Sequence, residues 1–384
     1  MWRFVVLLAL VVMVIVFGVS LIDLGSSSEV SARTVISGSP DATGFTRAFE
    51  PLDWQFPRDF GPHSDYQTEW WYYTGNLAAA DGRRFGFQFT IFRRGITPEG
   101  VASESEWRTN QLYMAHFAVT DVAGERFFHE ERFSRASADL AGAVIDPVYR
   151  VWLENWEVRA LDSEAQRTQI DAATESVALA LTLDQRKPPA LQGDRGLSAK
   201  SAEPGNASHY YSLTRLAAQG VVTILGESFE VEGYAWKDHE FSTSALGASA
   251  LGWDWFGLQL DDNRELMVGQ IRLTDGGRDP YFGGLLILPD ASTLYLDAED
   301  FTIEAIGSWE SPHTGAVYPS GWRIEVRPVG QEPFTLMLTP QLLDQELAGG
   351  DIAYWEGTVR IEGDATGYGY AELTGYVDAM TGRF

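Results

Sequence analysis

Apolar side chains alternate with small or polar ones along much of this chain. Phe85, Phe87 and Phe89, for example, are separated by Gly86 and Gln88. A period of two is typical of a β-strand, whose successive side chains point to opposite faces of a sheet. Further short apolar runs, each bounded by turn residues, occupy 112–119, 151–158, 176–183, 281–288, 301–306, 321–326, 334–338, 359–363 and 371–376. Short strands at this spacing, without a long helical period, predict an antiparallel sandwich or barrel.

The strand predicted at the start of the fold carries four consecutive aromatic residues, 70–73. Because alternate side chains point to opposite faces, both faces of this strand must be covered. Glu69 is predicted to share a face with Trp71 and to point inward, where a buried carboxylate needs a partner. Arg93 or His116 could supply it. His116 itself is either a core histidine bonded to a neighbouring hydroxyl or carboxylate, or a polar contact in a barrel lumen.

Two segments depart from the strand pattern. Residues 187–208 are rich in Pro, Gly and Ser, which predicts a long loop that serves as a linker or a lid. Residues 340–347 look modestly helical.

Two other segments resemble each other in the order of their features. Residues 71–93 and residues 253–272 each open with alternating aromatic residues, reach an Asp-containing turn and end in Arg. This order predicts that the two halves of the chain are versions of one barrel.

Residues 4–22 form an apolar run without charge, preceded by Arg3 and followed by Asp23. As a helix, this run would extend about 28 Å, close to the hydrocarbon thickness of a bilayer. Residues 1–24 are therefore predicted to be an uncleaved transmembrane anchor or a cleaved signal peptide. Either one implies a protein exported across the inner membrane, to be periplasmic, membrane-anchored or secreted. Residues 25–52, which are rich in small residues, would be its flexible tether.

Composition narrows the possible functions. The net charge of −26 argues against a nucleic-acid partner and against docking on anionic lipid, because both are polyanions. The absence of Cys excludes cysteine nucleophiles and thiolate metal sites. The 13 Trp residues favour a strand-rich fold or an aromatic-lined pocket.

The most unusual stretch lies in the middle of the chain. Lys237, Asp238, His239 and Glu240 stand in a row inside an apolar, strand-like region, and Asp254 follows. Charged groups are costly there unless they are paired or used. The row is interpreted as an ion-pair network between two barrels, as a catalytic or ligand-polarising site, or as a cation site on His239 and neighbouring carboxylates. Because no HExxH motif or clustered His is present, no metal and no cofactor is predicted.

Six motifs stand in order along the chain: EWWYYTGNL at 69–77, AWKDHE at 235–240, GWDWF at 252–256, DQE at 344–346, YWEG at 354–357 and ELTGY at 372–376. They resemble the AttH family of lipocalin-like exported proteins, which is related to bacterial carotenoid 1,2-hydratase (hydroxyneurosporene synthase). The resemblance covers about residues 55–384. It implies an all-β chain with two tandem lipocalin-like antiparallel β-barrels, expected here at 53–240 and 241–384. Some members of the family are encoded with ABC-type export systems.

Hydration of an isolated C=C bond needs a proton donor, a means of stabilising the resulting cation, and a water molecule. A carboxylic acid kept protonated by an apolar pocket can donate the proton, and aromatic faces can stabilise the cation. The resemblance to the hydratases implies His239 and Asp254 as the catalytic pair, with Trp253 and Phe241 in the wall. The hydratases usually carry Trp or a similarly large aromatic residue at the position of Phe241.

We expect the catalytic pair to share a dry, indole-walled chamber. On a regular strand Asp254 points away from both Trp253 and Trp255, so Asp254 is expected to face the lumen while the indoles face the other barrel. The residues expected to bind substrate around the pair are Trp236, Asp238, Phe241, Trp253, Trp255, Glu69, Trp71 and His116.

Together these features predict an exported protein that binds a hydrophobic, isoprenoid- or lipid-like small molecule, with hydratase-type acid catalysis at His239 and Asp254. The alternative is a non-catalytic lipid carrier or an accessory protein of an envelope ABC-type export system. Attachment to the inner membrane through residues 4–22 suits both. An enzyme would lose turnover but keep ligand binding in Asp254→Asn, whereas a carrier has no turnover to lose.

Overall fold

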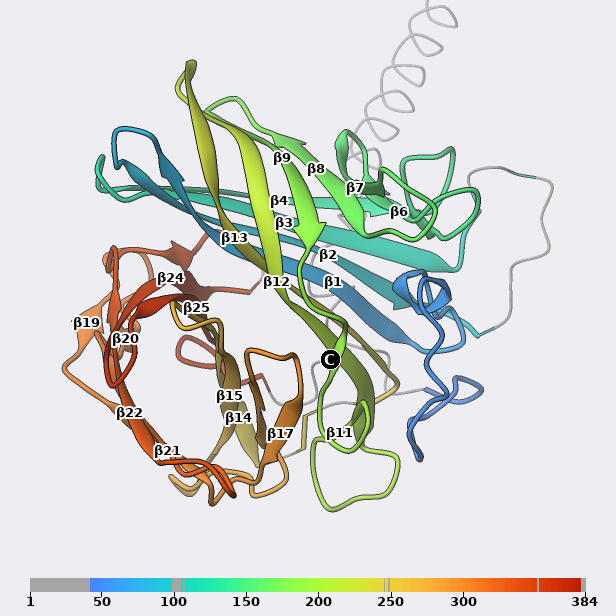
Figure 1. Cartoon of the computed structure of the whole chain (residues 1–384). Coiled ribbons are helices and arrows are strands. Elements are labelled where there is room, and N and C mark those ends of the chain that lie inside the picture. The colour runs from blue at the N-terminus through green and yellow to red at the C-terminus, as the bar shows by residue number, and fades with distance from the viewer. Residues whose placement is uncertain are drawn as a thin grey trace, which may run out of the picture.

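A computed structural model of the chain describes residues 42–98, 105, 108–244, 246–247, 249–350 and 352–380. Within this part the only helical element is a single 3₁₀ turn, η1 (Arg58–Phe60), and every other element is a β-strand. The strands form two nearly closed antiparallel barrels, seen in Figure 1. The prediction of an all-β chain with two barrels is confirmed.

The predicted anchor or signal peptide, residues 1–24, and most of the predicted tether lie outside the described residues, so both stay predictions. In the described ranges, no helix has the length and apolar character needed to cross a bilayer.

The first barrel is built from a sheet of 13 strands. Their order along the sheet is β4-β3-β2-β1-β13-β12-β9-β8-β7-β6-β5, and the short strands β10 and β11 pair with β12. The strands are β1 (Thr68–Ala79), β2 (Arg84–Gly95), β3 (Gln111–Asp121), β4 (Arg126–Arg135), β5 (Ala141–Val144), β6 (Arg150–Leu153), β7 (Trp156–Ala160), β8 (Arg167–Ala173), β9 (Val177–Gln185), β10 (Ala190–Leu191), β11 (Leu197–Ala199), β12 (Ala207–Ile224) and β13 (Glu227–Ser242).

The second barrel is built from a sheet of 10 strands in the order β17-β16-β15-β14-β25-β24-β22-β21-β18, with β23 paired to β24. A separate two-stranded sheet holds β19 and β20. The strands are β14 (Ala250–Leu260), β15 (Glu265–Leu273), β16 (Gly284–Ile287), β17 (Thr293–Leu296), β18 (Phe301–Ala305), β19 (Trp309–Glu310), β20 (Val317–Tyr318), β21 (Trp322–Val326), β22 (Phe334–Pro340), β23 (Glu346–Leu347), β24 (Tyr354–Gly363) and β25 (Gly367–Leu373).

Both barrels begin with a hairpin and close in the same way. The two segments that resemble each other in sequence, 71–93 and 253–272, run along the hairpins β1–β2 and β14–β15. In the first barrel β1 also pairs with the last strand, β13, and in the second β14 pairs with the last strand, β25. The two segments therefore hold equivalent places in the two barrels. The chain leaves the first sheet after Ser242 and enters the second at Ala250, shortly after the expected division at residues 240 and 241.

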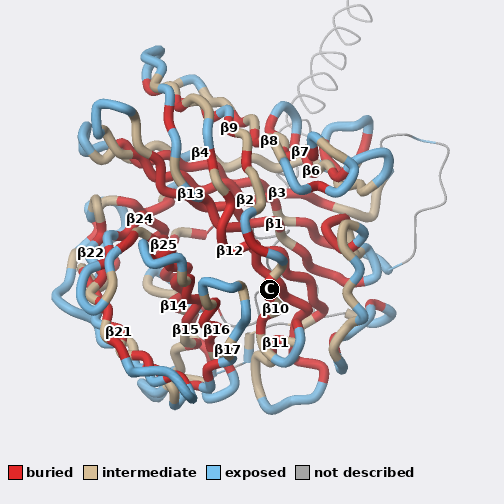
Figure 2. Tube along the Cα trace, viewed as in Figure 1, coloured by how far each residue is buried: buried red, intermediate tan, exposed pale blue. Residues whose placement is uncertain are grey.

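Side chains on β1 and β13 divide between two faces by residue number. Trp71 and His239, which are partners across the ladder, face the core of the first barrel and stack with ring centroids 5.0 Å apart. Tyr72 and Asp238, the next partners, face the second barrel. Because both faces are covered there, β1 is buried along most of its length and β13 along residues 235–242, as Figure 2 shows.

The second barrel presents its own outer face to the first. Phe256 and Leu258 of β14 pack in the core of the second barrel. Trp255, on the opposite face of the same strand, packs with Tyr72 and Trp236 of the first barrel. The outer faces of the two sheets thus meet. The indole of Trp255 faces the first barrel, as the sequence analysis expected.

Two sequence expectations about secondary structure are wrong. Residues 340–347 are not helical: β22 ends at Pro340, and β23 pairs with β24. Glu346 of β23 accepts hydrogen bonds from Thr314 and Tyr318, both at 2.7 Å, so tertiary pairing outweighs a weak helical pattern. Residues 187–208 are not one loop, because β10 and β11 pair with the first part of β12 while β9 pairs with the rest. This pairing supplies partners for the backbone of an 18-residue strand.

A buried ion network ties the barrels together. Glu265 of β15 is fully buried, and its Oε2 lies 2.8 Å from the Nζ atom of Lys187, which precedes β10. The guanidinium of Arg215, on β12, donates to Oε1 of the same carboxylate. Because all three side chains are buried, removing one of them would leave an uncompensated charge in the interior.

Candidate functional site: a cavity between the barrels

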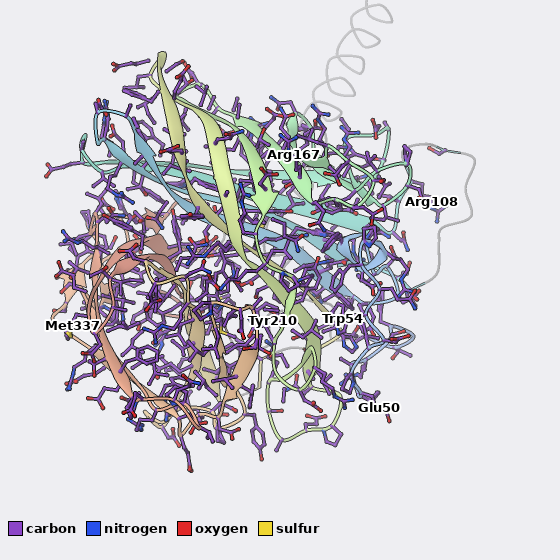
Figure 3. All side chains as sticks on the ribbon, in the orientation of Figure 1. Glu50, Trp54, Arg108, Arg167, Tyr210 and Met337 are labelled. Carbon is purple, nitrogen blue, oxygen red and sulfur yellow. The ribbon has the colours of Figure 1, made fainter. Side chains whose placement is uncertain are left out.

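A partly open cavity of about 130 Å³ lies between the two outer faces. An apolar protein cavity of about 150 Å³ is known to hold benzene, so this one admits a ring-sized group. Tyr210 of β12, labelled in Figure 3, lies at the junction and contributes to the lining. The aromatic residues of the lining are Trp70, Tyr72, Phe92, Tyr210, Trp253, Trp255, Phe282 and Tyr354.

Four carboxyl groups line the cavity, those of Asp238, Glu240, Glu356 and Glu372. Lys200 is the one lysine or arginine that the described residues contribute to the lining. Its Nζ atom lies 2.6 Å from Oε1 of Glu240, which also accepts a hydrogen bond from Ser208. The charge of Glu240 is therefore compensated, and the other three carboxyl groups are left without a cation in the lining.

Asp238 is held by three donors. Its carboxylate accepts hydrogen bonds from Ser212 at 2.5 Å, Tyr210 at 2.7 Å and the indole N–H of Trp236 at 2.7 Å. Burial raises the pKa of Asp238 to about 7, against the effect of these three donors, which favour the anion. Asp238 is thus fixed in position and has no oxygen free of a protein donor.

Glu356 and Glu372 form a pair across the β24–β25 ladder. Both side chains lie on the face that lines the cavity, where Glu356 is buried and Glu372 is half-buried. Burial, followed by the charge of Glu372, raises the pKa of Glu356 well above its usual range. Burial likewise raises the pKa of Glu372 to about 8, although its Oε1 accepts a hydrogen bond from the indole N–H of Trp253 at 3.0 Å. Two adjacent carboxyl groups in one apolar site do not both ionise.

Glu356 differs from the other carboxyl groups of the lining because neither of its oxygens makes a hydrogen bond of good geometry. The residue is only 1% exposed. The hydroxyl groups of Tyr72 and Tyr354 are close enough to lower its pKa, but they do not offset burial. A carboxyl group whose pKa burial raises well above its usual range therefore faces the cavity.

The aromatic wall is fixed by hydrogen bonds at its polar edges. The indole N–H of Trp255 donates to the hydroxyl of Tyr210 at 3.2 Å, and the ring meets Tyr72 edge-on with centroids 5.4 Å apart. Trp236 packs behind Asp238, with its ring centroid 6.1 Å from that of Trp255. Of these rings, those of Trp255, Tyr72 and Tyr210 line the cavity, where an aromatic face can stabilise a cation.

His116 also lines the cavity, rather than the lumen of the first barrel. Its Nδ1 lies 2.6 Å from the hydroxyl oxygen of Tyr354, and its Nε2 lies 2.9 Å from a carboxylate oxygen of Glu131. The expectation of a histidine satisfied by a hydroxyl and a carboxylate is met, and the alternative of a contact in the lumen is wrong. Because His116 is on β3 and Tyr354 on β24, this hydrogen bond joins the two barrels.

The structure does not bring His239 and Asp254 together, which corrects the expected chamber. His239 faces the core of the first barrel, where its Nδ1 lies 2.9 Å from the hydroxyl of Tyr211. Asp254 lies on the face of β14 opposite the cavity and is bonded to Arg272 at 3.1 Å and Gln270 at 2.8 Å. Neither residue lines the cavity. The cause is strand alternation, which turns both away from the shared interface.

The charged row 237–240 is split between two faces for the same reason. Lys237 and His239 face the interior of the first barrel, while Asp238 and Glu240 face the cavity. Burial lowers the pKa of Lys237 to about 7, and its Nζ atom is 3.2 Å from the hydroxyl of Tyr211. The row is therefore not an ion-pair network between the barrels.

Three of the expected substrate-binding residues belong to the first barrel instead of the cavity. Glu69 bonds Arg93 at 2.8 Å and His239 at 2.8 Å, so the expected partner is Arg93 and not His116. Burial alone would raise the pKa of Glu69, but Arg93 and the two nearby histidines outweigh it and lower the pKa. Trp71 stacks on His239, and Phe241 is fully buried on the same face. Asp238, Trp253, Trp255 and His116 do line the cavity, and Trp236 supports Asp238.

The carboxyl pair of Glu356 and Glu372 was not among the expected site residues, although both belong to recognisable motifs. In YWEG the aromatic Trp355 packs in the core of the second barrel, so alternation places Glu356 on the outer face. In ELTGY the same holds for Leu373 and Glu372. The sequence signal for each glutamate is its place beside a core residue in a strand, which puts the carboxyl group on the outer face of the barrel. Whether that group is buried depends on what covers the outer face, which the sequence does not show.

The raised pKa of Glu372 makes stability fall as pH rises. The folded state prefers the acid up to about pH 8, whereas the unfolded chain ionises near 4.5. Between these values the unfolded state binds fewer protons, so the free energy of unfolding falls by up to about 1.4 kcal/mol per pH unit. Glu372→Gln is expected to flatten this slope in urea titrations between about pH 5 and about pH 8. The exposed Glu362→Gln should keep it, and an unchanged slope in Glu372→Gln would contradict the assignment.

Comparison with known proteins agrees with this architecture. The family model described as AttH-like matches residues 47–376. A crystal structure of an AttH from Nitrosomonas europaea is 33% identical, with a TM-score of 0.76 over 87% of this chain and 100% of that chain. Kievitone hydratase from Nectria haematococca is 14% identical, with a TM-score of 0.62 over 87% of this chain and 99% of that one. CghA with Sch210972 is 12% identical, with a TM-score of 0.52 over 82% and 89%.

The similarity to kievitone hydratase and to CghA, at 14% and 12% identity, shows a shared fold and nothing more. A separate comparison with curated protein sequences finds no match. The family match covers most of the chain, and the Nitrosomonas protein is matched over its full length. This chain therefore belongs to the AttH-like family.

Proposed function

We propose that this protein binds a hydrophobic small molecule in the cavity between its barrels and adds water to a C=C bond of that molecule, with Glu356 as the acid. One observation carries the proposal: a buried carboxyl group whose oxygens make no hydrogen bond of good geometry faces an aromatic-walled cavity. Its pKa lies well above the usual range, so it holds a proton at neutral pH. Glu356 takes the catalytic place that the sequence assigned to Asp254.

The step is a protonation followed by capture of water. The proton of Glu356 passes to one alkene carbon, and the other carbon becomes a tertiary carbocation. The faces of Trp253 and Trp255 stabilise this cation, by about 1–2 kcal/mol each when water is excluded. A water molecule then forms the new C–O bond and returns one proton to the Glu356 carboxylate, so that the acid is restored and an alcohol is released. Glu372 accepts a hydrogen bond from the incoming water.

Two further observations support the proposal. Hydration is the activity named for kievitone hydratase, which shares the two-barrel fold. The lining also suits a neutral apolar ligand, because Glu356 and Glu372 are protonated near neutral pH and Glu240 is paired with Lys200. We place the activity outside the inner membrane, on the basis of the apolar run 4–22.

The same aromatic-walled lining favours a second function, the storage or transfer of a lipid without chemistry. In that case the protein is a carrier, or an accessory of an ABC-type exporter, and the carboxyl pair serves only to orient the ligand. A carrier binds its ligand and returns it unchanged.

The experiment begins with the purified protein and no assumption about the ligand. Solvent extraction and mass spectrometry identify what co-purifies, and a panel of isoprenoid alkenes is then incubated with the protein in H₂¹⁸O. Incorporation of ¹⁸O into a tertiary alcohol is the expected result. Ligand recovered without ¹⁸O would indicate the carrier, and failure to bind any apolar molecule would overturn both functions.

A further inference from the structure

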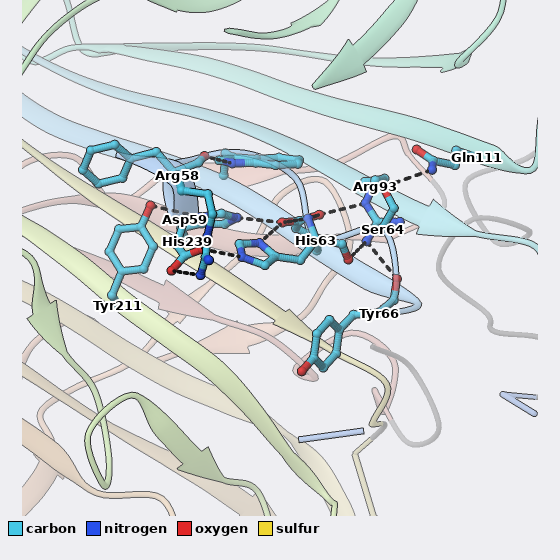
Figure 4. Close-up of polar contacts among 12 residues, drawn as sticks. Arg58, Asp59, His63, Ser64, Tyr66, Arg93, Gln111, Tyr211 and His239 are labelled. Atoms are coloured by element: carbon cyan, nitrogen blue, oxygen red, sulfur yellow. Dashed lines mark hydrogen bonds and ion pairs between the residues drawn. The ribbon is translucent and has the colours of Figure 1, made fainter. Parts of the chain in front are cut away.

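A second polar cluster lies in the first barrel, on the face of β1 and β13 opposite the cavity. It consists of His63, in the loop after η1, with Glu69 of β1 and His239 of β13. Figure 4 shows the two imidazoles converging on one carboxylate, with Arg93 on its other side. The hydration chemistry proposed above uses none of these side chains.

The distances within the cluster match those between ligands of one metal ion. Nδ1 of His63 lies 3.1 Å from Oε1 of Glu69, and Nε2 of His239 lies 2.8 Å from the same oxygen. All three atoms lie within 4.8 Å of one another. An ion bound at about 2.1 Å by each ligand needs neighbouring ligand atoms about 3.0 Å apart for octahedral and about 3.4 Å apart for tetrahedral coordination. The two nitrogen–oxygen distances lie within a few tenths of an ångström of the octahedral value.

The groups behind the ligands are placed as second-layer partners of a metal site. The remaining nitrogen of His63, Nε2, faces a carboxylate oxygen of Asp59 at 3.6 Å. The remaining nitrogen of His239, Nδ1, faces the hydroxyl of Tyr211 at 2.9 Å. Such contacts fix the tautomer and the ring orientation of a ligating histidine, with the proton on the nitrogen away from the ion.

Arg93 determines which oxygen of Glu69 is available. The guanidinium donates to Oε2 at 2.8 Å and leaves Oε1 facing the imidazoles. Glu69 would thus bind an ion through one oxygen. The positive charge of Arg93 weakens the site for a divalent ion, so moderate affinity is expected rather than that of a structural zinc site.

Solvent reaches the cluster only through His63, among its three side chains. Its side chain is 17% exposed, whereas those of Glu69 and His239 are fully buried. The imidazole of His63 stacks on Phe241 with centroids 3.7 Å apart and 7° between planes, which holds the ring in place.

We propose that His63, Glu69 and His239 form a binding site for one divalent first-row transition metal ion, through Nδ1, Oε1 and Nε2 respectively. Two imidazoles and one carboxylate select such ions over Mg²⁺ or Ca²⁺, which prefer oxygen ligands. The site is separate from the cavity, so its presence or absence leaves the proposed hydration untouched.

The test uses the untagged chain after dialysis against a chelator, with Zn²⁺ and Co²⁺ as probes. Calorimetry is expected to give one Zn²⁺ per chain, and Co²⁺ a visible absorption band that Zn²⁺ abolishes. His63→Ala should weaken Zn²⁺ binding at least tenfold, and His63→Gln, which keeps a polar side chain in the loop, should do the same. His313→Ala is the matched control, because His313 makes an exposed pair with Asp344 at 3.0 Å.

Circular dichroism verifies that each variant is folded. Equal Zn²⁺ affinity in the wild type and both His63 variants would overturn the site, as would a wild type that binds no Zn²⁺. In either case the cluster is a hydrogen-bond network and nothing more.

Discussion

Glu356→Gln is expected to lower hydration turnover by roughly 100- to 10,000-fold, the range of general acid catalysis, with little change in ligand affinity. Glutamine keeps the size and the polarity of the side chain but has no acidic proton to give. Turnover follows from ¹⁸O incorporation. Affinity follows from quenching of tryptophan fluorescence, because Trp253 and Trp255 lie in the cavity wall.

Two controls make this result interpretable. Glu362→Gln changes an exposed carboxyl group on the same strand and should leave turnover as it is. Asp254→Asn, the variant that the sequence alone would select, should alter stability through its contact with Arg272 while leaving turnover within a few-fold. If Asp254→Asn abolished turnover and Glu356→Gln did not, the assignment of the acid would be wrong.

Glu265→Gln is expected to destabilise the protein by about 3–5 kcal/mol, because it leaves the cations of Lys187 and Arg215 buried without a counter-charge. The loss should appear as a lower midpoint of urea unfolding. Because Glu265 lies on β15 and its partners lie on the first-barrel part of the chain, contact between the barrels should weaken as well. Limited proteolysis between β13 and β14 would report this as faster cleavage.

Asp262→Asn is the control for Glu265→Gln, because it also removes one negative charge from an ion pair. Asp262 pairs with Arg264 at 2.7 Å near the surface, where such pairs contribute about 0–1 kcal/mol. A loss in Glu265→Gln no greater than that in Asp262→Asn would mean that water reaches the network and screens it.

The sequence alone determined the strands and their two-fold grouping. The period of two around Phe85 to Phe89 is a local property, because it follows from the alternation of side chains along one extended chain. The repeated hairpin order in 71–93 and 253–272 and the ordered motifs were likewise readable without coordinates. Alternation also fixed that Asp254 points away from Trp253 and Trp255, and the structure agrees.

What the sequence did not determine is which face of each strand meets which partner. Alternation separates neighbours on one strand, but it does not relate His239 to Asp254, because their relative orientation depends on how two sheets pack. Strand alternation turns His239 and Asp254 away from the interface between the barrels. The same alternation turns Asp238 and Glu356 toward it, so that both line one cavity. That juxtaposition is decided by tertiary packing of the barrels, and burial there raises the pKa of Glu356 well above its usual range, which no local pattern predicts.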